Sequence, residues 1–137
     1  MTFRTNRLLA AALLGGCIAL IAAIPALASS TKTVTTAVNV TVNKSNDFKF
    51  VLSKSSVPKG TVKFTFANNG QLSHDFKVCS SNKGGTATSC TGKVTPMVTP
   101  GSKATLTVSL TKPGKYEYLC TVPGHAAGGM KGFIKVT

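Results

Sequence analysis

Short runs in which every second residue is apolar recur from Val34 to Val136, with Pro- and Gly-containing turns between them. The runs lie at Val34–Val42, Phe48–Leu52, Val62–Phe66, Leu72–Val78, Leu106–Leu110, Tyr116–Cys120 and Ile134–Val136. This alternation, rich in Val and Thr, indicates half-buried antiparallel strands, and no window after residue 28 sustains a helical period. We therefore predict an all-β fold, a Greek-key two-sheet β-sandwich of about seven to eight strands. Cys79 to Pro100, rich in Ser, Gly and Thr, is predicted as an irregular excursion.

The first 28 residues are predicted to be an export signal. Arg4 and Arg7 precede an apolar run, and Ala26-Leu27-Ala28 fits cleavage after Ala28. Two alternatives stay open: a lipid on Cys17, or retention of Leu8–Ala28 as a membrane anchor, which would allow association with a membrane surface. All three place the protein outside the cytoplasm, in the periplasm, at the cell surface or secreted. The expected organisation is a signal at 1–28, a linker at 29–36 and one sandwich domain at 37–137.

The charge balance excludes several functions. Lys and Arg total 16 against 3 Asp and Glu, a net charge of +13. The acids Asp47, Asp75 and Glu117 are too few and too scattered for a glycosidase carboxylate pair or an oxygen cage for Mg²⁺ or Ca²⁺. Basic blocks interleaved with aromatic residues are missing, so nucleic acid is not an expected partner. The lysines either keep an exported protein soluble or steer it toward an acidic partner, anionic lipid or a wall polymer.

Metal-ligand chemistry is concentrated near the C-terminus. Within a few residues Cys120, His125 and Met130 supply a thiol, an imidazole and a thioether, and His74 is the only other histidine. Two His, one Cys and one Met form the ligand set of a type 1 copper site. His74 shares the phase of the apolar face of its run, and Cys120 and Met130 share the phases of theirs. These three side chains are therefore predicted to point between the sheets, with His125 at the rim beside a small apolar patch.

Each of these residues also has an ordinary structural interpretation. His74 alone could be a core histidine, Met130 a core filler, Cys120 half of a disulfide and the Gly-rich loop a plain hairpin. Their joint order and phase favour a metal site.

Three motifs carry a family resemblance. Ser73-His74-Asp75-Phe76, Tyr116-Glu117-Tyr118-Leu119-Cys120 and the run from Gly124-His125 to Met130-Lys131-Gly132 resemble the cupredoxins, the small blue copper proteins such as plastocyanin, azurin and auracyanin. The resemblance covers Val34 to Thr137. It implies one mononuclear copper, single-electron transfer, and His74, Cys120, His125 and Met130 as ligands. Cys120 and His125 are spaced as in auracyanin rather than plastocyanin, and Asp75 stands where plastocyanin has Asn.

The cysteine count bears on the same site. Removal of the signal would leave three cysteines, an odd number for an exported protein. Cys79 and Cys90 bracket the start of the irregular excursion. A Cys79–Cys90 disulfide would close a short ring and leave Cys120 free as a thiolate.

We expect an electron carrier that acts as a monomer on redox protein partners with an acidic docking surface, and not an enzyme. No open coordination position or general base is evident in the sequence. Two alternatives remain: a copper carrier or storage protein of the cell envelope, and a metal-free cationic sandwich that binds the cell wall.

Overall fold

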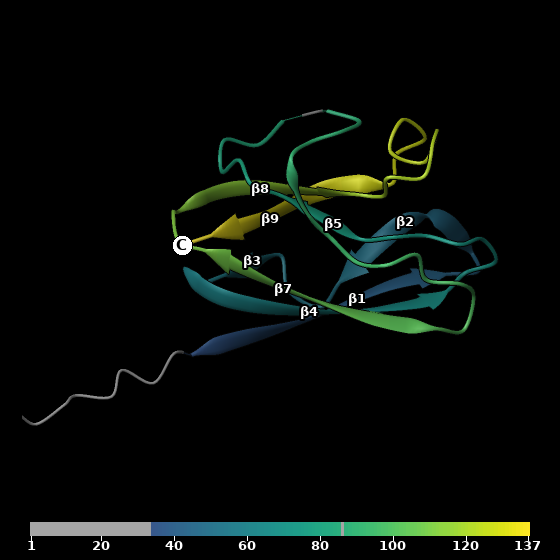
Figure 1. The fold of residues 1–137 in the computed structure, drawn as a ribbon, viewed down its shortest axis with the longest axis horizontal. Helices are drawn as coiled ribbons and strands as arrows, with labels where there is room; N and C mark the ends of the chain where they lie inside the picture. Colours follow the sequence, from purple (N-terminus) through teal and green to yellow (C-terminus); the bar gives the residue numbers. More distant parts are fainter. Residues whose placement is uncertain (1–33, 86) are drawn as a thin grey trace, which may run out of the picture. The chain divides into compact units, whose positions relative to one another are not determined.

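A computed structural model describes residues 34–85 and 87–137, and these form two packed β-sheets (Figure 1). The predicted signal, its alternatives and most of the predicted linker lie outside the described residues. The strands are β1 (Thr35–Asn43), β2 (Asn46–Leu52), β3 (Ser56–Val57), β4 (Gly60–Asn69), β5 (Lys77–Cys79), β6 (Gly92–Val94), β7 (Lys103–Leu110), β8 (Gly114–Leu119) and β9 (Lys131–Val136).

The nine strands divide into sheets of four and five. One sheet has the order β2-β1-β4-β7 and the other β3-β9-β8-β5-β6. Most pairs are antiparallel, but β1 pairs with β4 and β3 with β9 in parallel. The predicted all-β sandwich is confirmed, with a strand count slightly above the predicted range and two mixed sheets instead of purely antiparallel ones. β2 pairs antiparallel with β1 along the other edge of β1.

The core lies between the sheets and follows the predicted alternation. The inward residues of the first sheet are Val38, Val40, Val42, Phe50, Val62, Phe64, Phe66, Leu106, Val108 and Leu110. Phe76 is fully buried in the middle of an aromatic cluster, with its ring centroid 5.1 Å from that of Phe50, 5.3 Å from Phe64 and 5.5 Å from Tyr118. Since a sandwich of this size has one modest core, these rings supply much of its buried apolar area.

Several local predictions differ from the structure. β6 and the bridge residue Val98 lie inside the segment predicted as an irregular excursion. The run Leu72–Val78 is predicted as one strand, but β5 begins only at Lys77. His74 lies before it and pairs with Val98 through an isolated bridge. Leu72 and Phe48, placed by phase on inner faces, are 45% and 40% exposed. Alternation fails there because both residues lie at the end of the sandwich, where the second sheet no longer covers the first.

No helix long and apolar enough to cross a membrane occurs in residues 34–85 and 87–137.

Candidate metal centre

Three potential metal ligands converge in space. One nitrogen from each of His74 and His125 and the sulfur of Cys120 all lie within 4.8 Å of one another. The two Nδ1 atoms are 3.1 Å apart, and Cys120 Sγ lies 3.6 Å from His125 Nδ1 and 3.9 Å from His74 Nδ1. His74 and Cys120 are fully buried and His125 is half-buried. The structure thus brings together residues that are up to 51 positions apart in the chain.

The cluster lies at one end of the sandwich. Cys120 directly follows β8, Met130 directly precedes β9, and His125 lies in the loop between them. In Figure 1 this loop and the connection between β4 and β5, which carries His74, lie at the end away from the C-terminus. Two hydrogen bonds with Val98 hold His74, from His74 N to Val98 O (3.1 Å) and from Val98 N to His74 O (2.7 Å).

Backbone hydrogen bonds fix the loop from Cys120 to Met130. Cys120 N donates to Met130 O (3.0 Å), Met130 N to His125 O (2.9 Å) and His125 N to Val122 O (3.0 Å). The chain turns back at Gly129, whose φ of 106° lies in a region that L side chains rarely adopt. Met130 is fully buried in the main core, and its backbone contacts two of the three clustered residues. The loop geometry is therefore set by the main chain as well as by any ligand.

The Cys120 thiol sits in a desolvated environment that also contains donors. Burial raises its pKa from 9.0 to about 11, against the effect of the backbone N–H groups of Asp75 and Val122, which lower it. Asp75 itself is buried and does not join the cluster: its carboxylate accepts hydrogen bonds from the Thr121 backbone N–H (2.6 Å) and the Thr121 hydroxyl. Asp75 follows His74 and Thr121 follows Cys120, so this contact joins the segment that carries His74 to the loop that begins at Cys120.

His125 lies at the rim, as predicted. Its ring meets the edge of Phe48 with centroids 4.9 Å apart. Burial, and then the neighbouring charge of His74, lower the pKa of His125. Phe48 is 40% exposed, so the apolar surface beside His125 is larger than the small loop residues alone suggested.

Two residues that shape the site were missed by sequence reasoning. Asp47 Oδ1 lies 3.2 Å from His74 Nε2, the ring nitrogen opposite the cluster. Asn68, fully buried, donates to Leu72 O (2.7 Å) and Val98 O (2.8 Å) and accepts from Gly70 N (3.0 Å). The only signal in the sequence was their polar character at the ends of apolar runs, because their partners lie far along the chain.

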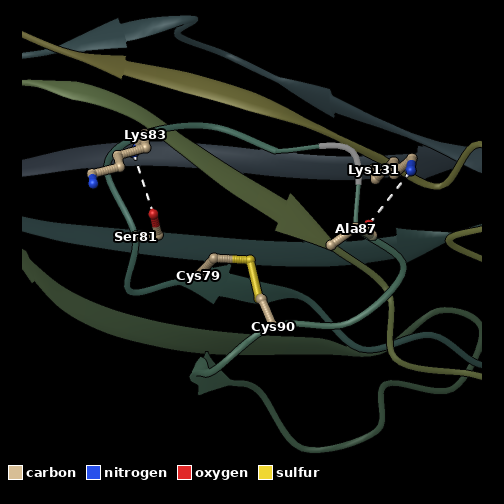
Figure 2. The surroundings of a disulfide bond; sticks show 6 residues. All are labelled: Cys79, Ser81, Lys83, Ala87, Cys90 and Lys131. Atoms are coloured by element: carbon tan, nitrogen blue, oxygen red, sulfur yellow. Dashed lines mark hydrogen bonds between the residues drawn. A yellow bond between two sulfur atoms is a disulfide. The ribbon is translucent and has the colours of Figure 1, made fainter.

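The remaining cysteines of the described residues are joined to each other. A disulfide links Cys79 at the end of β5 to Cys90 (Figure 2). Cys120 is free. The segment between them turns back near Ser81, whose hydroxyl accepts from Lys83 N, and approaches β9 where Lys131 Nζ donates to Ala87 O. The predicted pairing is thus present in the structure.

The donor set fits copper. A thiolate and two imidazoles are soft and borderline ligands that suit copper or zinc, and the oxygen ligands preferred by Mg²⁺ and Ca²⁺ are not part of the cluster. A thioether as a further ligand separates a type 1 copper site from a structural zinc site. Met130, the buried residue that closes the loop, carries such a thioether.

Fold and cluster together define a cupredoxin, a small β-sandwich with a mononuclear type 1 copper site. Residues 36–137 match the family described as copper binding proteins, plastocyanin/azurin family, and the chain belongs to that family. Copper is accordingly its cofactor.

Individual relatives agree with this family. Auracyanin-B of Chloroflexus aurantiacus is 44% identical over 43 residues, which are 31% of this chain and 18% of that protein. The copper-resistant cuproprotein CopI of Rubrivivax gelatinosus is 28% identical over 113 residues, covering 71% of this chain and 65% of CopI. The chain therefore spans less than two thirds of the length of these curated relatives.

Solved structures give the same fold. Auracyanin B has a TM-score of 0.61 at 22% identity over 77% of this chain and 91% of its own. Reduced auracyanin from Roseiflexus castenholzii has a TM-score of 0.56 at 26% identity, covering 75% of this chain and 96% of its own. Rusticyanin from Thiobacillus ferrooxidans has a TM-score of 0.56 at 27% identity, covering 75% and 77%.

Proposed function

We propose that this protein is an electron carrier that shuttles single electrons between redox partners through one type 1 copper. The observation that supports this most directly is the cluster of His74, Cys120 and His125, in which one cysteine sulfur and two imidazole nitrogens lie within 4.8 Å of one another. Bound copper would supply reversible one-electron exchange between Cu(I) and Cu(II).

We assign His74, Cys120 and His125 as the strong ligands that would hold copper, and Met130 as a weaker fourth ligand. Cys120 provides the thiolate, which the backbone N–H groups of Asp75 and Val122 stabilise once its proton has left. The two imidazoles bind both oxidation states. The assignment of Met130 as a ligand rests on its burial, its place at the end of the loop and the family resemblance.

The surrounding chain keeps these groups in place during electron transfer. Three backbone hydrogen bonds span the loop, and the Asp75–Thr121 contact joins it to the His74 segment. Because the ligand positions are fixed by the fold, little needs to rearrange when the charge at the site changes. The same packing leaves no evident open position for a substrate, so we infer a carrier and not an enzyme.

His125 is the exit point that the geometry favours for electrons. It is half-buried, and the partly exposed ring of Phe48 borders it with apolar surface. We infer that redox partners dock here, and that the net charge of +13 steers partners with an acidic surface toward the protein. A monomer suffices for this role.

The test is the visible spectrum of the protein loaded with Cu(II). We expect an intense thiolate-to-copper band that bleaches on reduction and returns on oxidation. His74→Ala and Cys120→Ser should each remove the band, while Met97→Leu, a matched change at an exposed methionine outside the cluster, should leave it intact. A colourless complex that does not change with redox state would contradict the proposal.

A second candidate is a copper carrier or storage protein of the cell envelope. The similarity to a copper-resistant cuproprotein over 71% of this chain favours it. The two functions differ in how readily the protein gives up its copper ion. A copper-delivery protein must release the ion to a competing chelator, whereas an electron carrier retains it through many redox cycles. Transfer of Cu(I) to a chelator within minutes would support the second candidate, and retention over hours would support electron transfer. Membership of a copper-binding family argues against the metal-free, wall-binding alternative.

We further infer that the protein works outside the cytoplasm. The disulfide in the folded domain is typical of an oxidising compartment, and it agrees with the export signal expected at residues 1–28. The mass of the protein isolated from its native membrane and soluble fractions would distinguish cleavage after Ala28 from a lipid on Cys17 or a retained anchor.

A further inference from the structure

The two ring nitrogens of His74 face different environments. Nδ1 faces the cluster, 3.1 Å from His125 Nδ1 and 3.9 Å from Cys120 Sγ. Nε2 faces away from it and lies 3.2 Å from Asp47 Oδ1. An ionised carboxylate can only accept a hydrogen bond, so Nε2 must carry the proton. A neutral His74 then has its lone pair on Nδ1, directed at the centre of the cluster.

Asp47 is itself held rigidly. Its carboxylate accepts hydrogen bonds from Gln71 N (3.0 Å to Oδ1 and 3.1 Å to Oδ2) and from Leu72 N (2.8 Å to Oδ2), and its side chain is only 11% exposed. A Cβ at position 70 would collide with this carboxylate, so Gly70 is required for the close approach. The segment that carries His74 is thus wrapped around the Asp47 side chain.

All the recorded hydrogen-bond contacts of this carboxylate suit an acceptor. The backbone N–H groups of Gln71 and Leu72 donate to its oxygens, and the His74 ring nitrogen lies within hydrogen-bonding distance of Oδ1. A single residue of β2 therefore brings a fixed negative charge and a fixed acceptor to the back of one imidazole.

We propose that Asp47 is a positioning residue of the copper site: its carboxylate holds His74 as the Nε2–H tautomer with Nδ1 presented to copper, and its charge favours Cu(II) over Cu(I). This inference rests on the ligand role of His74 proposed above. Partners on the far nitrogen of a ligating histidine fix its tautomer and raise its basicity. A negative charge close to the site stabilises the higher cationic charge more than the lower one.

Asp47→Asn is the informative variant because it keeps the shape of the side chain. The amide oxygen can still accept from Gln71 N and Leu72 N. The amide nitrogen would then face His74 Nε2 and can only donate, which moves the imidazole proton to Nδ1, the nitrogen assigned to copper. The variant thus reverses the tautomer preference and removes the charge while leaving the backbone contacts available.

The first experiment uses the copper-free protein. Long-range ¹H–¹⁵N correlation spectra of ¹⁵N-labelled protein at neutral pH distinguish the two tautomers of His74. We expect Nε2–H in the wild type and a shift toward Nδ1–H in Asp47→Asn. A wild-type His74 that is mainly Nδ1–H would overturn the proposal. This result does not depend on copper, so it is separable from a failure of the proposed function, which would show as a missing visible band.

The second experiment measures copper affinity and reduction potential. Loss of a hydrogen-bonded partner of a ligand typically weakens metal binding by about 10- to 100-fold. We expect Asp47→Asn to weaken Cu(II) binding more than Cu(I) binding, and a tenfold difference between the two corresponds to a potential higher by about 59 mV. Equal loss of both affinities, with the potential unmoved, would show a purely structural role and overturn the proposal.

Glu117→Gln is the matched control for charge. Glu117 is buried outside the cluster, and its Oε1 has no hydrogen-bond partner among the described residues, so the change replaces a second carboxylate by its amide without removing a hydrogen bond at Oε1. The potential should stay near the wild-type value in this variant. A rise equal to that of Asp47→Asn would mean that net charge alone is responsible and would overturn the positioning role. Thermal unfolding of both variants checks that the domain remains folded.

Discussion

Two irregular segments of this sandwich use cysteine in opposite ways. The loop from Cys120 to Met130 holds a free, fully buried thiol, whereas the segment from Cys79 to Cys90 is closed by a disulfide. The segments meet, since Cys79, Leu119 and Ala126 form a small buried cluster against which Cys90 packs. The disulfide takes up the two other thiols of the described residues, so Cys120 is left as the one free thiol among them.

The largest expected effect comes from removing the free sulfur. Cys120→Ser should abolish the intense visible band completely, because a hydroxyl does not give the thiolate-to-copper transition. The cost in the unfolding free energy of the copper-free protein should be about 1–3 kcal/mol, since a smaller and more polar hydroxyl replaces a fully buried thiol. Absorption and denaturant titration measure the two effects. A retained band would exclude Cys120 as the ligand.

Removing the paired sulfurs should give the reverse pattern. Cys79→Ser combined with Cys90→Ser opens a loop with a sequence separation of 11 and should lower the unfolding free energy of the copper-free protein by about 3 kcal/mol. The visible band of the copper-loaded form should persist. Guanidinium unfolding and absorption provide the measurements. A bleached band in this variant, with the fold intact, would show that the two segments are not independent.

Met130→Leu tests whether the last residue of the loop from Cys120 to Met130 is a copper ligand. Leucine has nearly the same volume, so the unfolding free energy should fall by less than about 1.5 kcal/mol despite the complete burial of Met130. Loss of the thioether should raise the reduction potential, because Cu(II) loses more from a missing donor than Cu(I) does. Voltammetry measures this change. An unchanged potential would mean that Met130 is a core residue and not a ligand.

The smallest effect is a pH dependence confined to the ligand loop. The pKa of Cys120 is raised from 9.0 to about 11, so the unfolded chain releases its thiol proton first and the stability of the copper-free protein should fall as pH rises from 9 to 11. The pKa of His125 is lowered from 6.5, so stability should also fall as pH drops below that value.

Thermal unfolding across this pH range provides the test, with the Cys120→Ser variant as control. In that variant the alkaline decline attributable to the thiol should disappear, while the acidic decline remains. An alkaline decline of the same size in both proteins would assign it to another group. The disulfide-bonded Cys79 and Cys90 do not titrate, so they contribute to neither the acidic nor the alkaline decline in stability.

Much of the site was predictable because its ligands carry distinctive chemistry. The order of His74, Cys120, His125 and Met130, and the pairing of Cys79 with Cys90, could be inferred from residue type, spacing and an odd number of cysteines. The residues around the ligands could not. Asp47, Asn68 and Thr121 are common polar residues, and only their contacts with His74, the Val98 bridge and Asp75 give them a role.

The sequence by itself determined which faces of most strands are buried, because alternation along a strand is a local property of the extended backbone. It also determined the soft donor set. Only the tertiary structure decided that β1 pairs in parallel with β4, that β6 forms within an apparently irregular segment, and that Asp47 stands behind His74. The physical reason is that pairing and contact between distant segments depend on how the whole core packs. A local pattern indicates which face of a strand is buried, but it does not indicate which strands lie beside it.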